Sequence, residues 1–289
     1  MSLVLRPFTL ALALLALAVP ASAAPAIWEV RDADSRIWLF GSFHLLPEDV
    51  VWRTPLFDKA FKQSDKVYFE ADVSPQAQTE LVAQTYAMGF NLDGTLLSDM
   101  LAPAQVDALR AVAQDLGVPM PALLTMKPWL AANTLSVAVM TDMGYDTTRG
   151  VEVLLQTELP AERKGYLETG KEQLDILAGA PEQEQIDMLI ATTAEIGELP
   201  AVLTDMLDAW TEGTPEKFAE LFLADLAGYA ETFVDRLIFD RNRRWVPALE
   251  TMLANNEEAF VVVGTGHLVG GDSVVDLLEQ AGYSIERLQ

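Results

Sequence analysis

The apolar positions form short β-type runs near both ends of the chain and helical patterns between them. Runs of β-branched and aromatic residues predict strands, and apolar residues spaced three and four apart predict helices. The predicted strands are 27–30, 36–40, 66–71, 164–167, 259–263 and 283–288. The predicted helices are 75–88, 103–116, 128–143, 150–159 and 271–280, and the pattern from about 172 to 253 is helical almost throughout.

Strands that alternate with long helical stretches predict an α/β fold of mixed character, in which helices cover a central sheet. The stretch from about 172 to 253 is expected to be a large helical insertion. Within it, Thr214 followed by Pro215 predicts a helix start with Thr214 as N-cap. Because no long linker or fixed repeat divides the chain, residues 25–289 are expected to form a single domain.

Residues 1–24 have the pattern of a cleavable secretory signal. Arg6 gives a positive start, an apolar run follows at 8–19, and small residues follow at 20–23. The apolar run is short for a membrane span, which needs about 20 residues. We therefore expect a periplasmic or secreted protein with no stable membrane insertion after the signal is removed.

The composition combines a large excess of acid with an absence of cysteine. With 19 Lys and Arg against 43 Asp and Glu, the formal net charge is −24. Such a surface repels nucleic acid and anionic lipid, so nucleic acid is not expected as a partner. The charge accounts first for solubility, and it also favours divalent cations and cationic substrates. The absence of Cys excludes disulfides, thiolate metal ligands and Cys nucleophiles.

Both histidines of the chain follow predicted strands. His44 ends the tetrapeptide Gly-Ser-Phe-His at 41–44, and His267 ends Gly-Thr-Gly-His at 264–267. Ligands of open α/β sheets bind beyond the carboxyl ends of the strands, and imidazole is the commonest side-chain ligand of transition metals. We therefore expect His44 and His267 to converge on one site, with an ordinary polar role at a loop start as the alternative.

Acidic residues beside apolar segments are further candidates for this site. Glu70 ends the third strand, where a carboxylate is costly unless it is paired or bound to a metal. A salt bridge or a solvent-exposed strand end would also explain it. Glu152 and Glu168 stand near the starts of segments, where either one could belong to the site or simply occupy a helix terminus.

The densest basic cluster, Arg-Asn-Arg-Arg at 241–244, lies on a predicted helix. A guanidinium at Arg241 could hold a carboxylate or stabilise an oxyanion. The alternative is a helix face that pairs with surface acids. The pattern does not distinguish whether Arg241, Arg243 or Arg244 faces the site.

Taken in order, these motifs resemble the TraB/GumN family. The resemblance rests on 41–47, 70, 150–152, 167–169, 241–242 and 263–268, followed by the Leu-Leu run that ends in Gly-Tyr at 277–283. The family includes the Tiki proteins, which are metal-dependent proteases with two GxxH motifs, and it is distantly similar to the erythromycin esterase and ChaN-like groups.

The resemblance implies that His44 and His267 are metal ligands or catalytic residues and that Glu70 is their carboxylate partner. It also implies that Arg241 lies in the site, with Asn242 orienting it. The implied metal is manganese or cobalt, and a His and carboxylate ligand set also suits zinc.

The leading functional hypothesis is a metal-dependent hydrolase that cleaves a peptide or ester bond with a metal-activated water. Arg241 would stabilise the oxyanion or hold a substrate carboxylate, and Glu152 or Glu168 would transfer a proton or orient a ligand. The expected substrate is a peptide or a small molecule. The alternatives are a non-catalytic periplasmic protein that binds a metal or haem and a regulatory cell-envelope protein with a degenerate site.

Overall fold

The structure is a computed structural model that describes residues 23–289, and its centre is a six-stranded mixed sheet. The strands lie in the order β4-β3-β5-β2-β1-β6. They are β1 (Ile27–Arg31), β2 (Arg36–Ser42), β3 (Lys66–Phe69), β4 (Lys164–Tyr166), β5 (Ala259–Gly264) and β6 (Ser284–Arg287). The expected α/β class is confirmed.

The helices account for most of the remaining chain. They are α1 (Pro55–Gln63), α2 (Pro75–Gly89), α3 (Pro103–Asp115), α4 (Met120–Leu123), α5 (Pro128–Asp142), α6 (Val151–Glu158), α7 (Gly170–Ala178), α8 (Glu182–Glu195), α9 (Leu199–Thr211), α10 (Pro215–Leu226), α11 (Glu231–Val234), α12 (Asp240–Ala254) and α13 (Val274–Gln280). A π-helix, Asp235–Phe239, joins α11 to α12.

The pairing of the strands brings both GxxH motifs to one edge of the sheet. β1 and β2 form the predicted antiparallel hairpin, while β2, β5, β3 and β4 run parallel to one another. In the ladder between β2 and β5, Ser42 pairs with Gly264. The loops that carry His44 and His267 therefore begin side by side.

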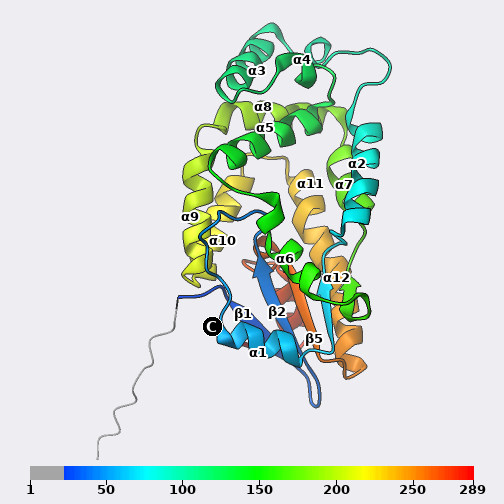
Figure 1. Cartoon of the computed structure of the whole chain (residues 1–289), viewed down its shortest axis with the longest axis vertical. Coiled ribbons are helices and arrows are strands. Elements are labelled where there is room, and N and C mark those ends of the chain that lie inside the picture. The colour runs from blue at the N-terminus through cyan, green and yellow to red at the C-terminus, as the bar shows by residue number, and fades with distance from the viewer. Residues whose placement is uncertain (1–22) are drawn as a thin grey trace, which may run out of the picture.

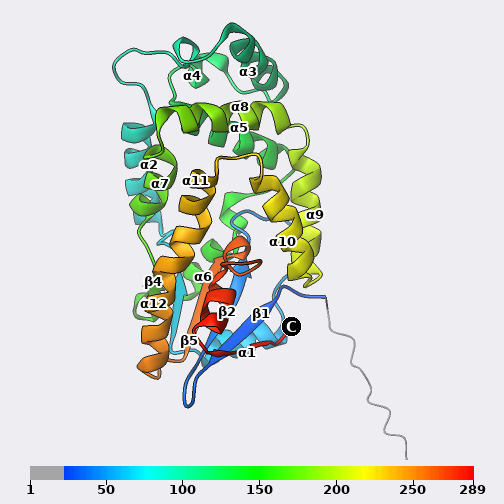
Figure 2. The same ribbon diagram turned by 180° about the vertical axis from the view of Figure 1, so that it is seen from behind.

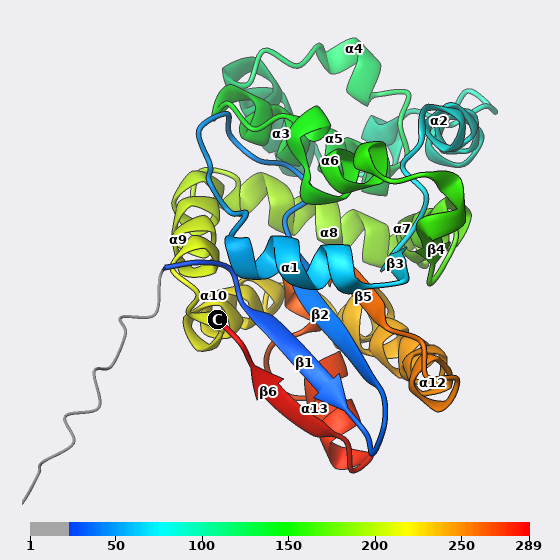
Figure 3. The same ribbon diagram turned by 60° about the horizontal axis from the view of Figure 1, so that its bottom comes forward.

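Helices lie on both faces of the sheet and beyond its carboxyl edge. Figure 1 shows α1 and α6 in front of the sheet, and Figure 2 shows α12 and α13 on the opposite side. Figure 3 shows β6 at one edge of the sheet, next to β1, with the C-terminus beside it. In Figure 1, α5 and α8 form a layer above the sheet. The large apolar side chains between these layers include the packed rings of Phe40, Phe57 and Phe260.

The helical region consists of two segments, and the second covers the stretch expected to be helical at about 172–253. One segment, 75–158, lies between β3 and β4, and the other, 170–254, lies between β4 and β5. They pack together through α5 and α8, where Leu135 and Leu189 share one apolar cluster. The apolar surface of α5 extends around the helix because it is buried by helices from both segments.

The predicted signal at 1–24 lies almost wholly outside the described residues, which begin at residue 23. In the part of the chain that is described, no helix is long and apolar enough to cross a membrane.

Helix α10 does begin at Pro215, but Thr214 does not cap it through its side chain. The Thr214 hydroxyl instead donates to the carbonyl oxygen of Ala209, 3.0 Å away.

Candidate functional site

Gly264, at the end of β5, lies at the centre of the site. A Cβ placed on this glycine would lie 3.2 Å from Glu70 Oε1, 3.4 Å from His44 Nε2 and 3.7 Å from His267 Cδ2. The Gly264 N–H donates to Glu70 Oε1 at 2.7 Å. The structure thus brings together the two histidines and the acid that the sequence singled out, and a side chain at Gly264 would press against all three.

A buried carboxylate, that of Glu152, orients the His44 ring through its Nδ1. This Nδ1 lies 2.8 Å from Glu152 Oε1, and the Ser42 hydroxyl donates to the same oxygen. Glu152 lies in the first turn of α6, where the helix dipole also favours a negative charge. The His44 side chain is 59% exposed, whereas that of Glu152 is 7% exposed. The imidazole therefore presents Nε2 to the open side of the site.

Arg241 lies at the other side of the cluster and holds two glutamates. Its Nη2 donates to Glu70 Oε2 and to Glu168 Oε1, and its Nε lies 3.0 Å from Glu168 Oε1. Glu168 is brought there by the continuation of the β3–β4 ladder, because its N–H donates to the carbonyl oxygen of Glu70 at 2.9 Å. Arg241 Nη1 donates to the carbonyl oxygen of Leu237, 3.1 Å away in the π-helix. Arg241 is thus the arginine that faces the site.

The neighbouring arginines point elsewhere. Arg243 pairs with Asp240 on its own helix, and both side chains are about half exposed. Arg244 is 58% exposed and comes no closer than 3.9 Å to Glu168 Oε2. The basic run at 241–244 therefore combines one buried site residue with a solvated helix face.

The contacts of His267 determine its tautomer. Arg241 Nη1 lies 2.9 Å from His267 Nε2, and Asn242 Oδ1 lies 2.7 Å from His267 Nδ1. Because an arginine only donates and an amide oxygen only accepts, Nδ1 carries the proton and Nε2 accepts from the guanidinium. Asn242 therefore orients His267, whereas the resemblance had implied that it orients Arg241. The Trp245 ring lies 4.5 Å from the imidazole and covers it.

The two imidazoles have opposite electrostatic surroundings. The charge of Glu152 raises the pKa of His44 to about 9. Burial lowers the pKa of His267 to about 3, and this keeps the ring neutral. Burial opposes the ionisation of Glu70, but Arg241, the two histidines and the Gly264 N–H together outweigh it, and the pKa of Glu70 falls to about 2. The site therefore contains ionised carboxylates and one neutral imidazole.

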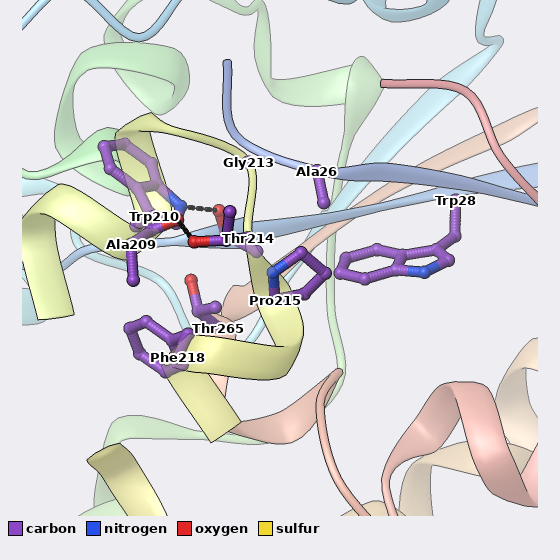
Figure 4. Close-up of a pocket in the computed structure, with 10 residues that line it drawn as sticks. Ala26, Trp28, Ala209, Trp210, Gly213, Thr214, Pro215, Phe218 and Thr265 are labelled. Atoms are coloured by element: carbon purple, nitrogen blue, oxygen red, sulfur yellow. Dashed lines mark hydrogen bonds between the residues drawn. The ribbon is translucent and has the colours of Figure 1, made fainter. Parts of the chain in front are cut away.

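The first GxxH loop is anchored from the helical side. Trp210 and Thr265, labelled in Figure 4, line a small pocket together with Gly41, the first residue of this motif. Trp210 Nε1 donates to the carbonyl oxygen of Gly41 at 2.8 Å, and the Thr265 hydroxyl donates to that of Ser42 at 3.0 Å. A Cβ on Gly41 would lie 2.8 Å from the Thr265 hydroxyl oxygen. The first glycine of the motif is thus needed for the close approach of the two loops.

Two residues of the site were not predicted from the sequence. Gln173, in α7, donates through Nε2 to Glu70 Oε2 at 2.8 Å and to Glu168 Oε1 at 2.9 Å. Ser42 lies inside the first motif but was not assigned a role. An amide in the turn of a helix carries no distinguishing pattern, so only its position five residues after Glu168 could have pointed to Gln173.

The fit of a divalent metal depends on these contacts. Within residues 23–289, no three His, Asp or Glu side chains are arranged to hold a metal ion. The donor chemistry suits a divalent metal. The carboxylates of Glu70, Glu152 and Glu168 outnumber the single buried guanidinium, and the histidines offer imidazole nitrogen as a ligand. His44 Nε2 and Glu70 face the same space beside Gly264. His267 Nε2, by contrast, is bound to Arg241.

Comparisons with known proteins agree with the motifs. The chain is 36% identical over 66 residues to a protein of Amphimedon queenslandica named metalloprotease TIKI homolog, and this stretch covers 22% of the chain and 13% of that protein. It is 38% identical over 56 residues to the metalloprotease TIKI homolog of Nematostella vectensis, of which 12% is covered. No solved structure matches the chain significantly. The profile of the TraB/PrgY/gumN family matches residues 26–287, and the chain therefore belongs to this family.

Proposed function

We propose that this protein is a metal-dependent hydrolase that cleaves a peptide or ester bond. The proposal rests mainly on one observation: His44 Nε2, Glu70 and the His267 ring surround Gly264 at the carboxyl edge of the sheet. The similarity to proteins named metalloproteases supports the same class of reaction. The predicted secretory signal would place this activity in the periplasm or outside the cell.

His44 and Glu70 would hold the metal, and His267 would be the third ligand once it exchanges its hydrogen bond with Arg241 for the metal. A bound divalent metal supplies a water with a pKa near 7 and polarises the carbonyl under attack. Manganese, cobalt and zinc all accept such ligands. Three protein ligands leave positions open for water and substrate.

The other residues would position the ligands. Glu152 fixes the His44 ring through Nδ1, and Asn242 fixes that of His267. Arg241 keeps Glu70 ionised and holds Glu168 beside it through its guanidinium hydrogen bonds. Every nitrogen of its guanidinium already contacts the protein, so we assign it to the ligands rather than to a substrate oxyanion. Glu168 remains the candidate for proton transfer.

The geometry favours a single ion over a haem clamp. Both imidazoles face the same glycine beside charged carboxylates, whereas a haem held axially needs a flat apolar slot between them. A regulatory role with a degenerate site would predict no affinity for divalent metals.

Metal binding by the purified mature protein tests the proposal. We expect calorimetry and elemental analysis to find stoichiometric manganese, cobalt or zinc in the parent and none in the variant His44→Ala/His267→Ala. Gly264→Ala is the matched steric variant, because its methyl group would enter the space between the ligands without meeting any atom closer than 3.2 Å. Peptides and esters would then be screened with the loaded protein. If the parent binds no metal and the double variant behaves identically, the metallohydrolase proposal is wrong.

A further inference from the structure

The guanidinium group of Arg241 is surrounded by groups of the kind that bind metals. Its Nη2 donates to Glu70 Oε2 and Glu168 Oε1, and its Nη1 lies 2.9 Å from His267 Nε2. Carboxylate oxygen and neutral imidazole nitrogen are ordinary ligands of divalent cations, and here they bind an organic cation instead. The Trp245 ring lies 4.7 Å from Arg241 Cζ and packs against the guanidinium.

The buried acids of this cluster need a cation. The side chains of Glu70, Glu168 and Arg241 are all almost fully buried. Two adjacent carboxylates without a counter-ion would repel each other strongly at this depth, because little water screens them. Arg244 also approaches Glu168, but only to 3.9 Å and with an exposed side chain. Arg241 is therefore the cation that neutralises the site when no metal is bound.

Arg241 and a metal compete for one atom of His267. A neutral imidazole has one nitrogen lone pair, and Asn242 fixes the proton of this ring on Nδ1, so the lone pair is on Nε2. Arg241 Nη1 occupies that lone pair. The same Nη1 is held by the carbonyl oxygen of Leu237, 3.1 Å away. The guanidinium therefore has to release His267 before Nε2 can bind a metal.

The proposed ligands keep their orientation without Arg241. The Gly264 N–H donates to Glu70 Oε1 at 2.7 Å, and Gln173 Nε2 donates to Glu70 Oε2 at 2.8 Å. Both histidine rings are fixed through Nδ1 by other side chains. Removal of Arg241 would thus take away a competitor and leave the ligands in place. If Arg241 acted mainly by positioning the ligands, its removal would weaken metal binding, so the sign of the effect separates the two roles.

We propose that Arg241 is the resident cation of the metal-free site and that it limits the affinity of the site for metal. The guanidinium keeps the metal-free protein neutralised and folded, and it yields His267 only to a cation that binds the ligands more strongly. The proposal rests on the proposed hydrolase function and adds to it an element that regulates loading of the same site.

Metal affinity in variants of Arg241 tests the proposal. We expect Arg241→Ala to bind manganese at least about tenfold more tightly than the parent in calorimetry at constant ionic strength. Arg244→Ala is the matched control, because it removes an exposed guanidinium further along α12, 3.9 Å from Glu168 Oε2. It should bind manganese as the parent does. Arg241→Gln is a second neutral replacement with more bulk, and it should show the same gain.

Replacement of the missing group by a small ion tests the same point from the opposite direction. Methylguanidinium chloride should occupy the space vacated in Arg241→Ala. It should raise the melting temperature of this variant without metal and return its manganese affinity towards that of the parent. Methylammonium chloride has the same charge but lacks the planar fork of donors, so it should do neither. Neither salt should change the manganese affinity of Arg244→Ala.

Unchanged or weaker manganese binding by Arg241→Ala and Arg241→Gln would overturn the proposal, and so would an affinity of Arg241→Ala that methylguanidinium leaves unaltered. These outcomes are distinct from those that test the hydrolase function, which depend on the parent. A parent that binds manganese as tightly as Arg241→Ala would contradict only the role of Arg241. Binding by Arg241→Ala and not by the parent would support that role and count against a metal-dependent function of the parent.

Discussion

At the scale of single residues, the surroundings of His44 and His267 predict opposite titration behaviour. In the metal-free protein we expect His44 to titrate near pH 9, above its usual 6.5, because Glu152 stabilises the imidazolium. His267 should stay neutral throughout the physiological range. Glu152→Gln should return the His44 pKa towards 6.5. NMR titration of the two imidazole signals, assigned with single His variants, measures both values, and a His44 pKa unaffected by Glu152→Gln would contradict the assignment.

The sign of this shift has two consequences. Because the folded pKa of His44 is raised, its contribution to stability is fully present below pH 6.5 and is lost as the pH rises through about 9. A metal at Nε2 competes with the same proton, so its affinity should increase over the same range. The pH dependence of metal binding and that of stability therefore run in opposite directions.

The sequence predicted those residues of the site whose position after a strand or in a motif carries meaning. His44, Glu70 and His267 follow strands, and the structure places all three beside Gly264. It did not predict Gln173, because the contacts of this residue depend on how α7 packs against the end of β3. The sequence also did not show that Asn242 orients His267 and not Arg241, because consecutive residues on a helix point in different directions.

At the scale of elements, the start of α6 depends on Gly150. A Cβ at this position would lie 2.0 Å from the carbonyl oxygen of His44, and the next N–H, that of Val151, donates to the carbonyl oxygen of Phe43 at 3.0 Å. Gly150→Ala should therefore push the first GxxH loop away from α6 and separate His44 from Glu152. The overpacking should cost about 1–3 kcal/mol of the free energy of unfolding.

Chemical denaturation and metal binding measure the two effects of Gly150→Ala. The control is Gly197→Ala, because a Cβ at Gly197 meets nothing within 4 Å. The control should leave both the stability and the metal affinity near those of the parent. A stable Gly150→Ala protein with parental metal affinity would show that α6 and the loop can separate without consequence for the site.

Periodicity predicted the elements more reliably than their partners. The hairpin of β1 and β2 and the helices α3 and α5 begin where the pattern predicted them. The insertion of β5 between β2 and β3 was not predicted, because similar apolar runs fit any position in a buried parallel sheet. The π-helix before α12 also has no sequence signature, although it supplies the Leu237 carbonyl that Arg241 binds.

At the scale of the whole molecule, the net charge of −24 affects how any metal binding is measured. A strongly acidic surface gathers divalent cations without a specific site, and added salt screens its self-repulsion. Thermal stabilisation by a metal salt therefore combines a general effect with the effect of the proposed site. Only the site effect should depend on the space around Gly264, while the general effect should be the same in any variant that keeps the charge.

We therefore expect the parent and Gly264→Ala to differ in their response to metal at a constant ionic strength of about 0.15 M. With free metal at about 100 times its dissociation constant, the parent should gain about 2.7 kcal/mol. At about 2–4 °C per kcal/mol for a domain of this size, the rise in its melting temperature is readily measured. Gly264→Ala should gain no more than either protein gains from sodium chloride of equal ionic strength. Equal rises in the two proteins would mean that the metal acts through the acidic surface, and the cluster of His44, Glu70 and His267 would then be no metal site.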